Sequence, residues 1–151
     1  MKVLGTLLLV IVGVVGAAAP ATARGAVSCQ AINAKGVGQD LGGGRTTARI
    51  IGGGLLHGTT EASFVVTGLS GSLASFQGTI VFTVNRGTLT ANVSGTLDLA
   101  SGAFAASTSS IEGTDKLAGA SGNLSFNGVE DFSDGSFTED VSGEICVNLA
   151  P

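Results

Sequence analysis

The sequence predicts an all-β protein, a closed antiparallel up-and-down barrel of about eight strands. Three observations support this prediction. Val, Ile, Leu and Phe alternate with polar residues through most of the chain, which is the period of a strand. Gly-containing turns separate these short segments, and 25 of the 151 residues are Gly whereas only two are Pro. Two cysteines lie near opposite ends of the chain, where they would join the first strand to the last.

The first 23 residues predict a secretory signal peptide. A basic start, "MK", precedes the apolar run "VLGTLLLVIVGVVGAAA", which Pro20 interrupts. The small residues "ATA" at 21–23 fit cleavage after Ala23. A retained anchor is the alternative, because the apolar run reaches the lower limit of spanning length. Cleavage would leave one β-barrel domain, residues 24–151, secreted to the extracellular space or the periplasm.

The composition argues against two classes of partner. One of the seven basic residues is Lys2, so six remain in the predicted mature domain against eleven acidic residues, a formal net charge of −5. The chain has no basic cluster, no Trp and no Tyr. Because binding to nucleic acid requires basic side chains that neutralise phosphates, we expect no nucleic-acid partner. The same argument predicts no membrane partner after signal cleavage, and the sequence leaves the oligomeric state open.

Cys29 and Cys146 are the two cysteines of the chain. In an exported protein, two thiols so placed most simply form one disulfide. A redox or metal-ligand pair is the competing interpretation, but the chain has no CxxC spacing and one His. We therefore predict a disulfide at the seam of the barrel and assign no metal or cofactor. The strand phase places Cys146 on the outer face.

The first two predicted strands lie near residues 27–34 and 46–51, and the third follows in "LLHGTTEASFVVTG". In this third segment Leu56, Ala62, Phe64 and Val66 face inward by the period of two. His57 lies on the outer face with Glu61 and Ser63. Because a sheet exterior does not exclude water, we interpret His57 as a surface histidine rather than a general base.

Three hairpins follow, and each is registered on a two-residue turn. Asp-Gly favours such a turn strongly, whereas Arg-Gly and Ser-Gly are weaker and leave a bulged three-residue loop as the alternative. Each register places apolar residues opposite apolar residues, and a slip by one residue would turn the whole set to solvent. The turns and their first pairs are Arg86-Gly87 with Val84 opposite Leu89, Ser101-Gly102 with Leu99 opposite Phe104, and Asp134-Gly135 with Phe132 opposite Phe137.

The segment "IEGTDKLAGASGNLSFNG", residues 111–128, resembles the allene oxide cyclase barrel-like families, which include plant dirigent proteins. Those proteins carry a similar Gly-Thr-x-Lys segment between two strands of an eight-stranded antiparallel barrel. The likeness extends more loosely over residues 45–149, and its distinctive part is 113–122. The resemblance implies the fold. The cyclases of the family close an oxylipin epoxide into a ring and the dirigent members orient radical coupling, but no catalytic residue of either matches a position here.

Two carboxylates occupy inward positions of the last hairpin. In the predicted register Glu130 and Glu139 face each other, and like charges in that arrangement destabilise a sheet. Three explanations remain open. Both groups are solvated at the barrel mouth, or they bind Ca²⁺, or they form a pair with one raised pKa that suits proton transfer.

Small and polar residues at inward positions predict space inside the barrel. The strand that begins at Phe104 continues inward through Ala106 and further polar residues. An eight-stranded barrel is about the size that holds one small ligand. The alternative is that Phe82 and Phe126 fill the interior. The candidate cavity or mouth residues are Thr108, Ser110, Glu112, Glu130 and Glu139, and no residue is assigned a catalytic role.

We therefore expect a non-enzymatic module that binds a small hydrophobic ligand. One alternative is an isomerase or cyclase that uses Glu130 and Glu139. Another is a structural cell-surface protein that assembles through an exposed strand edge such as "GTIVFTVN", which has high β-propensity and no Pro.

Overall fold

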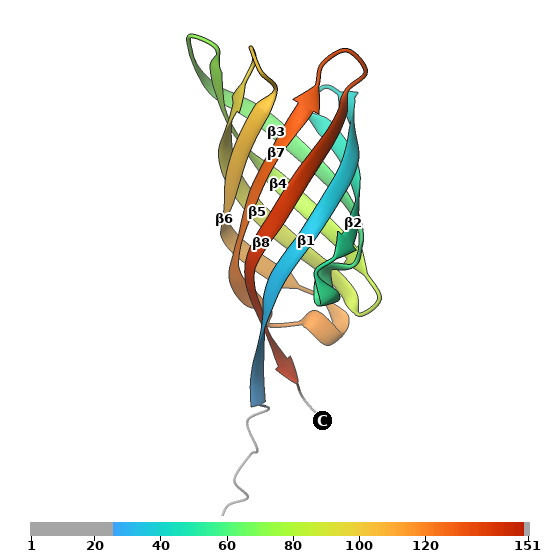
Figure 1. The fold of residues 1–151 in the computed structure, drawn as a ribbon. Helices are drawn as coiled ribbons and strands as arrows, with labels where there is room; N and C mark the ends of the chain where they lie inside the picture. The colour runs from blue at the N-terminus through green and yellow to red at the C-terminus, as the bar shows by residue number, and fades with distance from the viewer. Residues whose placement is uncertain (1–25, 150–151) are drawn as a thin grey trace, which may run out of the picture.

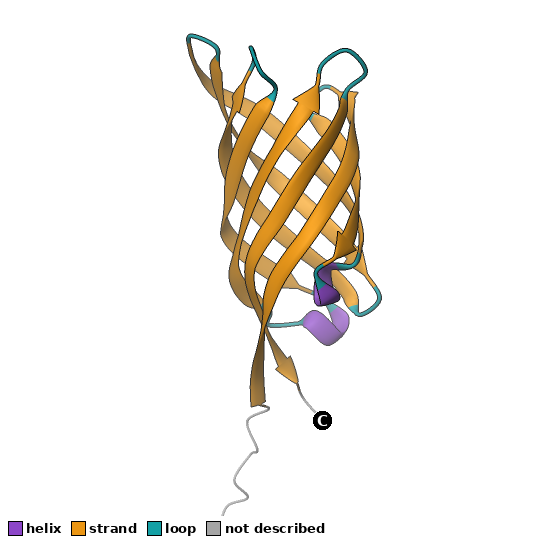
Figure 2. Ribbon diagram, viewed as in Figure 1, coloured by secondary structure: helices purple, strands orange, loops and turns teal. Residues whose placement is uncertain are grey.

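The computed structural model describes residues 26–149, which form a closed barrel of eight antiparallel strands (Figures 1 and 2). Each strand pairs with the next, and β8 pairs with β1, so the predicted up-and-down barrel is confirmed. The strands are β1 (Ala26–Gly42), β2 (Arg45–Gly52), β3 (Gly58–Ser70), β4 (Leu73–Val84), β5 (Gly87–Asp98), β6 (Ala103–Gly113), β7 (Ser121–Asp131) and β8 (Ser136–Leu149).

The two ends of the barrel differ. Four short loops lie together at one end, which we call the open end: residues 43–44, 71–72, 99–102 and 132–135 (Figure 1). The other end, which we call the closed end, carries two 3-10 turns, η1 (Gly54–Leu56) and η2 (Asp115–Leu117). Leu56 and Leu117 are fully buried and pack into the core from these turns. The first residues of β1 and the last residues of β8 also lie at the closed end.

The core fills the middle and the closed half of the barrel. Phe82 and Phe126 are both buried and stack with ring centroids 6.4 Å apart. The largest fully buried side chains are Phe82, Ile50, Leu56, Leu89, Leu117, Leu124, Ile145 and Val141. The alternative in which Phe82 and Phe126 fill the interior is therefore correct for the middle of the barrel, and it leaves the open half to be described below.

All three predicted hairpin registers are wrong by two residues. In the first hairpin Val84 pairs with Gly87, so the turn residues are Asn85 and Arg86. Gly87 belongs to the strand, where a Cβ would lie 2.6 Å from the carbonyl oxygen of Thr114. Because the error is even, the inward and outward faces of β4 and β5 are as predicted.

The other two hairpins have four-residue loops rather than two-residue turns. Leu97 pairs with Phe104, and Glu130 pairs with Phe137. An aspartate organises each loop: the N–H of Ala100 donates to Oδ1 of Asp98 at 3.0 Å, and the N–H of Ser133 donates to Oδ1 of Asp131 at 2.9 Å. These side-chain bonds stabilise loops that the Ser-Gly and Asp-Gly dipeptides alone do not predict.

A β-bulge in β6 overturns two predicted inward positions. Asn92 pairs with Ser110 and Val93 with Thr108, so Ser109 has no partner across β5. The extra residue reverses the phase of the strand, and Ile111 is buried at 8% exposure. Ser110 and Glu112 are exposed, and their predicted place in the cavity is wrong. Periodicity alone does not reveal such a bulge.

The predicted disulfide is confirmed. Cys29 and Cys146 lie directly opposite each other in the β1–β8 pairing, with a sulfur–sulfur distance of 2.05 Å. The Cys29 side chain is exposed, in agreement with a bond outside the barrel. A disulfide is compatible with an oxidising compartment. Within residues 26–149 the structure contains no helix long and apolar enough to cross a membrane, and the predicted signal peptide lies outside the described residues.

Candidate functional site

The open half of the barrel contains a cavity of about 210 Å³. Its wall reaches the surface at the open end, where Val66 is 65% exposed. The stacked rings of Phe82 and Phe126 line the inner end of the cavity. Six of the seven phenylalanines of the chain line the cavity: Phe64, Phe76, Phe82, Phe104, Phe126 and Phe137.

Glycines on neighbouring strands explain why this half is hollow. Phe64 pairs with Gly78 and Phe76 with Gly95, and a Cβ on either glycine would overlap the ring. Phe104 covers Gly128 in the same way, and Phe137 covers Gly38. Each ring thus lies over the backbone of the adjacent strand, where a side chain would otherwise stand. The rings line the wall, and the centre stays empty.

The four rings near the open end form two edge-to-face pairs. The centroids of Phe64 and Phe76 are 5.3 Å apart, and those of Phe104 and Phe137 are 6.0 Å apart. This geometry is favourable for aromatic rings because the positive edge of one meets the negative face of the other. Each pair therefore stabilises the position of its two rings in the wall.

Glu139 is the carboxylate that lies deepest in this aromatic wall. Its neighbours across the sheet are both glycines, Gly36 on β1 and Gly128 on β7. A Cβ on Gly36 would lie 2.6 Å from Cγ of Glu139, so the missing side chain makes the space that the carboxyl group occupies. Burial raises the pKa of Glu139 to about 7. Glu139 therefore exists in both protonated and ionised forms at neutral pH.

Glu130 and Asp40 form a second acidic group nearer the open end. Burial raises the pKa of Glu130, and the charge of Asp40 and a hydrogen bond with it add to the effect. The predicted pairing of Glu130 with Glu139 is wrong, because Phe137 faces Glu130 and Gly128 faces Glu139. The raised pKa of Glu139 therefore comes from desolvation and not from a facing carboxylate.

The geometry does not favour the calcium explanation for these glutamates. Among the described residues, the three side chains close enough to hold one metal ion together are Cys29, Glu144 and Cys146, and the two sulfurs already form the disulfide. Asp40, Glu130 and Glu139 do not converge in this way. Ca²⁺ takes six to eight oxygen ligands, whereas this cavity is mostly apolar.

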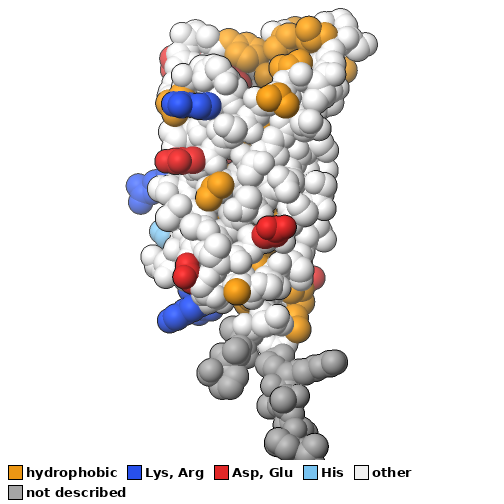
Figure 3. All heavy atoms as spheres, turned by 180° about the vertical axis from the view of Figure 1, so that it is seen from behind, with side chains coloured by type: hydrophobic (Ala, Val, Ile, Leu, Met, Phe, Trp, Pro, Cys, Tyr) orange, Lys and Arg blue, Asp and Glu red, His pale blue; other side chains and the backbone are white. Residues whose placement is uncertain are grey.

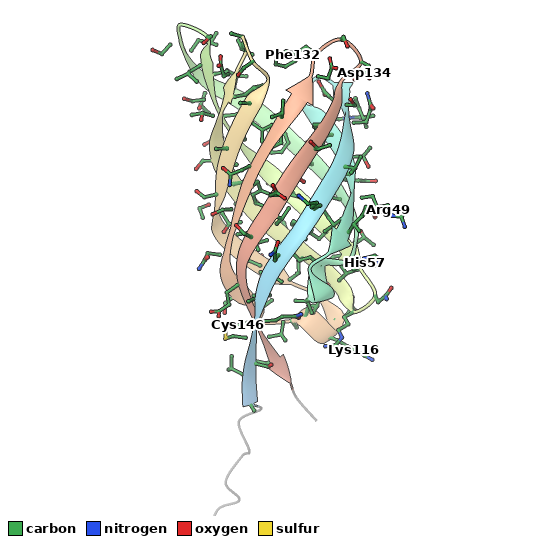
Figure 4. The ribbon with its side chains drawn as sticks, in the orientation of Figure 1. Arg49, His57, Lys116, Phe132, Asp134 and Cys146 are labelled. Carbon is green, nitrogen blue, oxygen red and sulfur yellow. A yellow bond between two sulfur atoms is a disulfide. The ribbon has the colours of Figure 1, made fainter. Side chains whose placement is uncertain are left out.

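Of the remaining predicted site residues, Thr108 lies in the wall but does not line the cavity. Its Oγ1 accepts the N–H of Leu124 at 2.9 Å, at the place where the β6–β7 pairing ends. Thr108 is thus a structural residue. His57 is exposed and lies near the closed end, away from the cavity (Figure 4), as expected for a surface histidine.

Asp40 and the full aromatic wall were not predicted. The signal for Asp40 is present, because the alternation Ile32, Ala34, Gly36, Gly38 and Asp40 continues the inward face of β1. The first predicted strand covers residues 27–34, and the next two inward positions hold Gly36 and Gly38. These two glycines make room for Glu139 and Phe137.

The entrance is apolar as well. Exposed hydrophobic side chains surround it, and Figure 3 shows such side chains gathered at the open end. Phe132 is the remaining phenylalanine, which does not line the cavity. It is 50% exposed and lies on the loop at 132–135 (Figure 4). The others are Leu41, Leu69, Leu73 and Leu99, and the five come from all four loops or the strand ends beside them. An apolar molecule that enters the cavity would pass these side chains.

The Gly36→Ala variant tests the space around Glu139. The added methyl group would overlap the Glu139 side chain and displace its carboxyl group toward the cavity. We expect the volume left for a ligand to shrink and the affinity for a cavity-sized probe to fall about tenfold, measured by NMR titration. Gly68→Ala is the control, because the nearest atom to its added Cβ is 4.0 Å away. Equal affinity in both variants would contradict this role for Gly36.

Comparisons with protein-family models, with curated proteins and with solved structures found no match to this chain. The candidate site therefore rests on the geometry of the molecule itself: an aromatic cavity with one open end, and three carboxylates in its wall.

Proposed function

We propose that the protein is a non-enzymatic module that binds one small apolar molecule in the cavity at the open end. The observation that carries the proposal is the aromatic wall, in which rings cover glycines and leave the centre empty. An apolar cavity of about 150 Å³ in another protein binds benzene. At about 210 Å³, this cavity suits a molecule with a single aromatic ring and a short substituent.

The energetics support a ligand of this kind. Removing apolar surface from water contributes about 25 cal/mol for each square ångström. The wall is already held in place by the edge-to-face ring pairs, so little order remains to be imposed when a ligand enters. A preformed apolar pocket with a few polar groups is the usual form of a small-molecule site.

A cavity-filling variant tests the proposal. Ala106 lines the cavity, whereas Ala105, its neighbour in β6, is exposed on the outer face. We expect Ala106→Leu to lower the affinity for the neutral probe 2-phenylethanol at least tenfold, and Ala105→Leu to leave it unchanged. The chain has no Trp or Tyr, so binding is followed by NMR of the probe and of the protein amides. Absence of binding by the unaltered protein to 2-phenylethanol and toluene would contradict the proposal.

An isomerase or cyclase is the second candidate, and the buried position of Glu139 in the cavity wall favours it. A pKa of about 7 suits a group that accepts and returns a proton at neutral pH. The barrel agrees with the fold that the resemblance to allene oxide cyclases implies, but fold alone does not carry an activity. If the protein is such an enzyme, Glu139→Gln should abolish turnover of a cyclisable substrate. Unchanged turnover in this variant would contradict the enzymatic function.

Assembly through a free strand edge is less favoured. The segment "GTIVFTVN" belongs to β4 and the turn after it, and β4 pairs with β3 on one side and β5 on the other. Because the barrel is closed, no strand among the described residues presents a whole unpaired edge. Sedimentation of the purified protein tests this candidate, and a filament or large oligomer would support it.

A further inference from the structure

The charges in the cavity wall all have one sign. Asp40, Glu130 and Glu139 line it, and no Lys, Arg or His among the described residues does so. A ligand that carries a carboxylate would meet repulsion from each of these groups that is ionised. A ligand that is neutral would gain nothing from the charges of the wall.

The aromatic rings add to this preference. The face of a phenylalanine ring carries negative charge density and attracts an organic cation, an interaction that is stronger where water is excluded. Phe104 and Phe137 lie on the side of the wall that also holds Glu139, because Phe104 covers Gly128, the neighbour of Glu139, and Phe137 precedes it by two residues in β8. The same part of the cavity therefore offers both rings and a carboxylate to a positive charge.

A bare metal ion does not fit this wall. Its ligands would have to be oxygens gathered around one point, whereas the three carboxylates do not converge and the rest of the wall is apolar. An ammonium group attached to an apolar body matches both parts. Its charge meets Glu139 and the rings, and its body fills the remaining volume.

From this geometry we infer that the cavity selects a small organic cation, an amine or quaternary ammonium on an apolar body of about one aromatic ring. This inference rests on the proposed function, because it names the class of ligand for the same cavity. Binding of the cation would favour the ionised form of Glu139, so the affinity for an amine should rise with pH. The charged groups that face the ligand in this range are Glu139, Glu130 and Asp40.

Three probes of similar size test the selectivity: 2-phenylethylamine, 2-phenylethanol and phenylacetate, which are cationic, neutral and anionic at pH 8. We expect the amine to bind at least tenfold more tightly than the alcohol, and phenylacetate to bind most weakly. In Glu139→Gln the ratio of the amine affinity to the alcohol affinity should fall to threefold or less. Glu144→Gln is the matched control, because Glu144 lies on the outer face of the same strand.

The outcomes separate the two proposals. If the alcohol binds and the amine binds no better, the selectivity is overturned and the apolar binding function stands. If the amine preference persists in Glu139→Gln, the assignment to Glu139 is overturned. If none of the three probes binds, and toluene does not bind either, both proposals fail. An amine affinity that rises about tenfold from pH 5.5 to pH 8 in the unaltered protein, and rises clearly less in Glu139→Gln, where Glu130 and Asp40 remain, supports the inference.

Discussion

Replacing Cys29 and Cys146 together by Ser is expected to lower the free energy of unfolding by about 4 kcal/mol. The disulfide joins residues 117 positions apart, and cross-linking a loop of that length removes much of the entropy of the unfolded chain. Closure of the barrel depends on β1 and β8 meeting, which is the pairing of greatest sequence separation. Urea unfolding followed by far-UV circular dichroism measures the change.

The cavity provides the control for this experiment. The disulfide lies near the closed end, where Figure 4 labels Cys146. The cavity lies in the open half. We therefore expect the folded double variant to bind 2-phenylethanol with unchanged affinity under native conditions. Ser142→Ala, an exposed change at the same β1–β8 pairing, should cost less than 1 kcal/mol. A loss below 1 kcal/mol in the double Cys variant would mean that the unfolded chain already keeps its ends close.

The Glu139→Gln variant is expected to be more stable than the unaltered protein above neutral pH, by at most about 3 kcal/mol. Burial raises the pKa of Glu139 from 4.5 to about 7, so the folded state holds a proton that the unfolded state has lost. The stability of the unaltered protein should therefore fall as pH rises from about 4.5 to about 7. Glutamine fills the same space without a charge and removes this loss.

Urea unfolding of both proteins at pH 4 and pH 8 measures the effect. At pH 4 Glu139 is protonated in both states, and the two proteins should be nearly equal in stability. Glu130 has a raised pKa as well and contributes with the same sign in both proteins. The exposed Glu144→Gln serves as control and should follow the unaltered protein. Parallel stability profiles for Glu139→Gln and the unaltered protein would contradict a desolvated Glu139.

The fold was predictable because the signal is spread over many residues. Inward and outward faces depend on a period of two, and an error of two residues in a hairpin leaves every face unchanged. All three hairpin registers were wrong in this way, and the barrel was still correct. In each four-residue loop the aspartate before the loop, Asp98 or Asp131, accepts a backbone N–H two residues later and so stabilises the observed register. The sequence does not show this hydrogen bond, because it depends on the backbone conformation of the loop.

The site was less predictable because it depends on pairing between strands. Glu139 was found from its inward phase, but its environment depends on Gly36, which is distant in sequence and adjacent only in the correct register. An error of two residues leaves the faces intact and still changes the neighbour of each side chain. The prediction that Ser110 and Glu112 face inward was wrong for another reason. The single extra residue, Ser109, reverses the inward and outward alternation of β6 after it.

The described ends of β1 and β8 both lie at the end of the barrel opposite the entrance (Figure 1). A tag or linker joined beyond either end would therefore emerge on the far side from Phe132 and its neighbouring loops. Immobilising the protein on a biosensor surface through such a linker would leave the entrance facing the flowing solution.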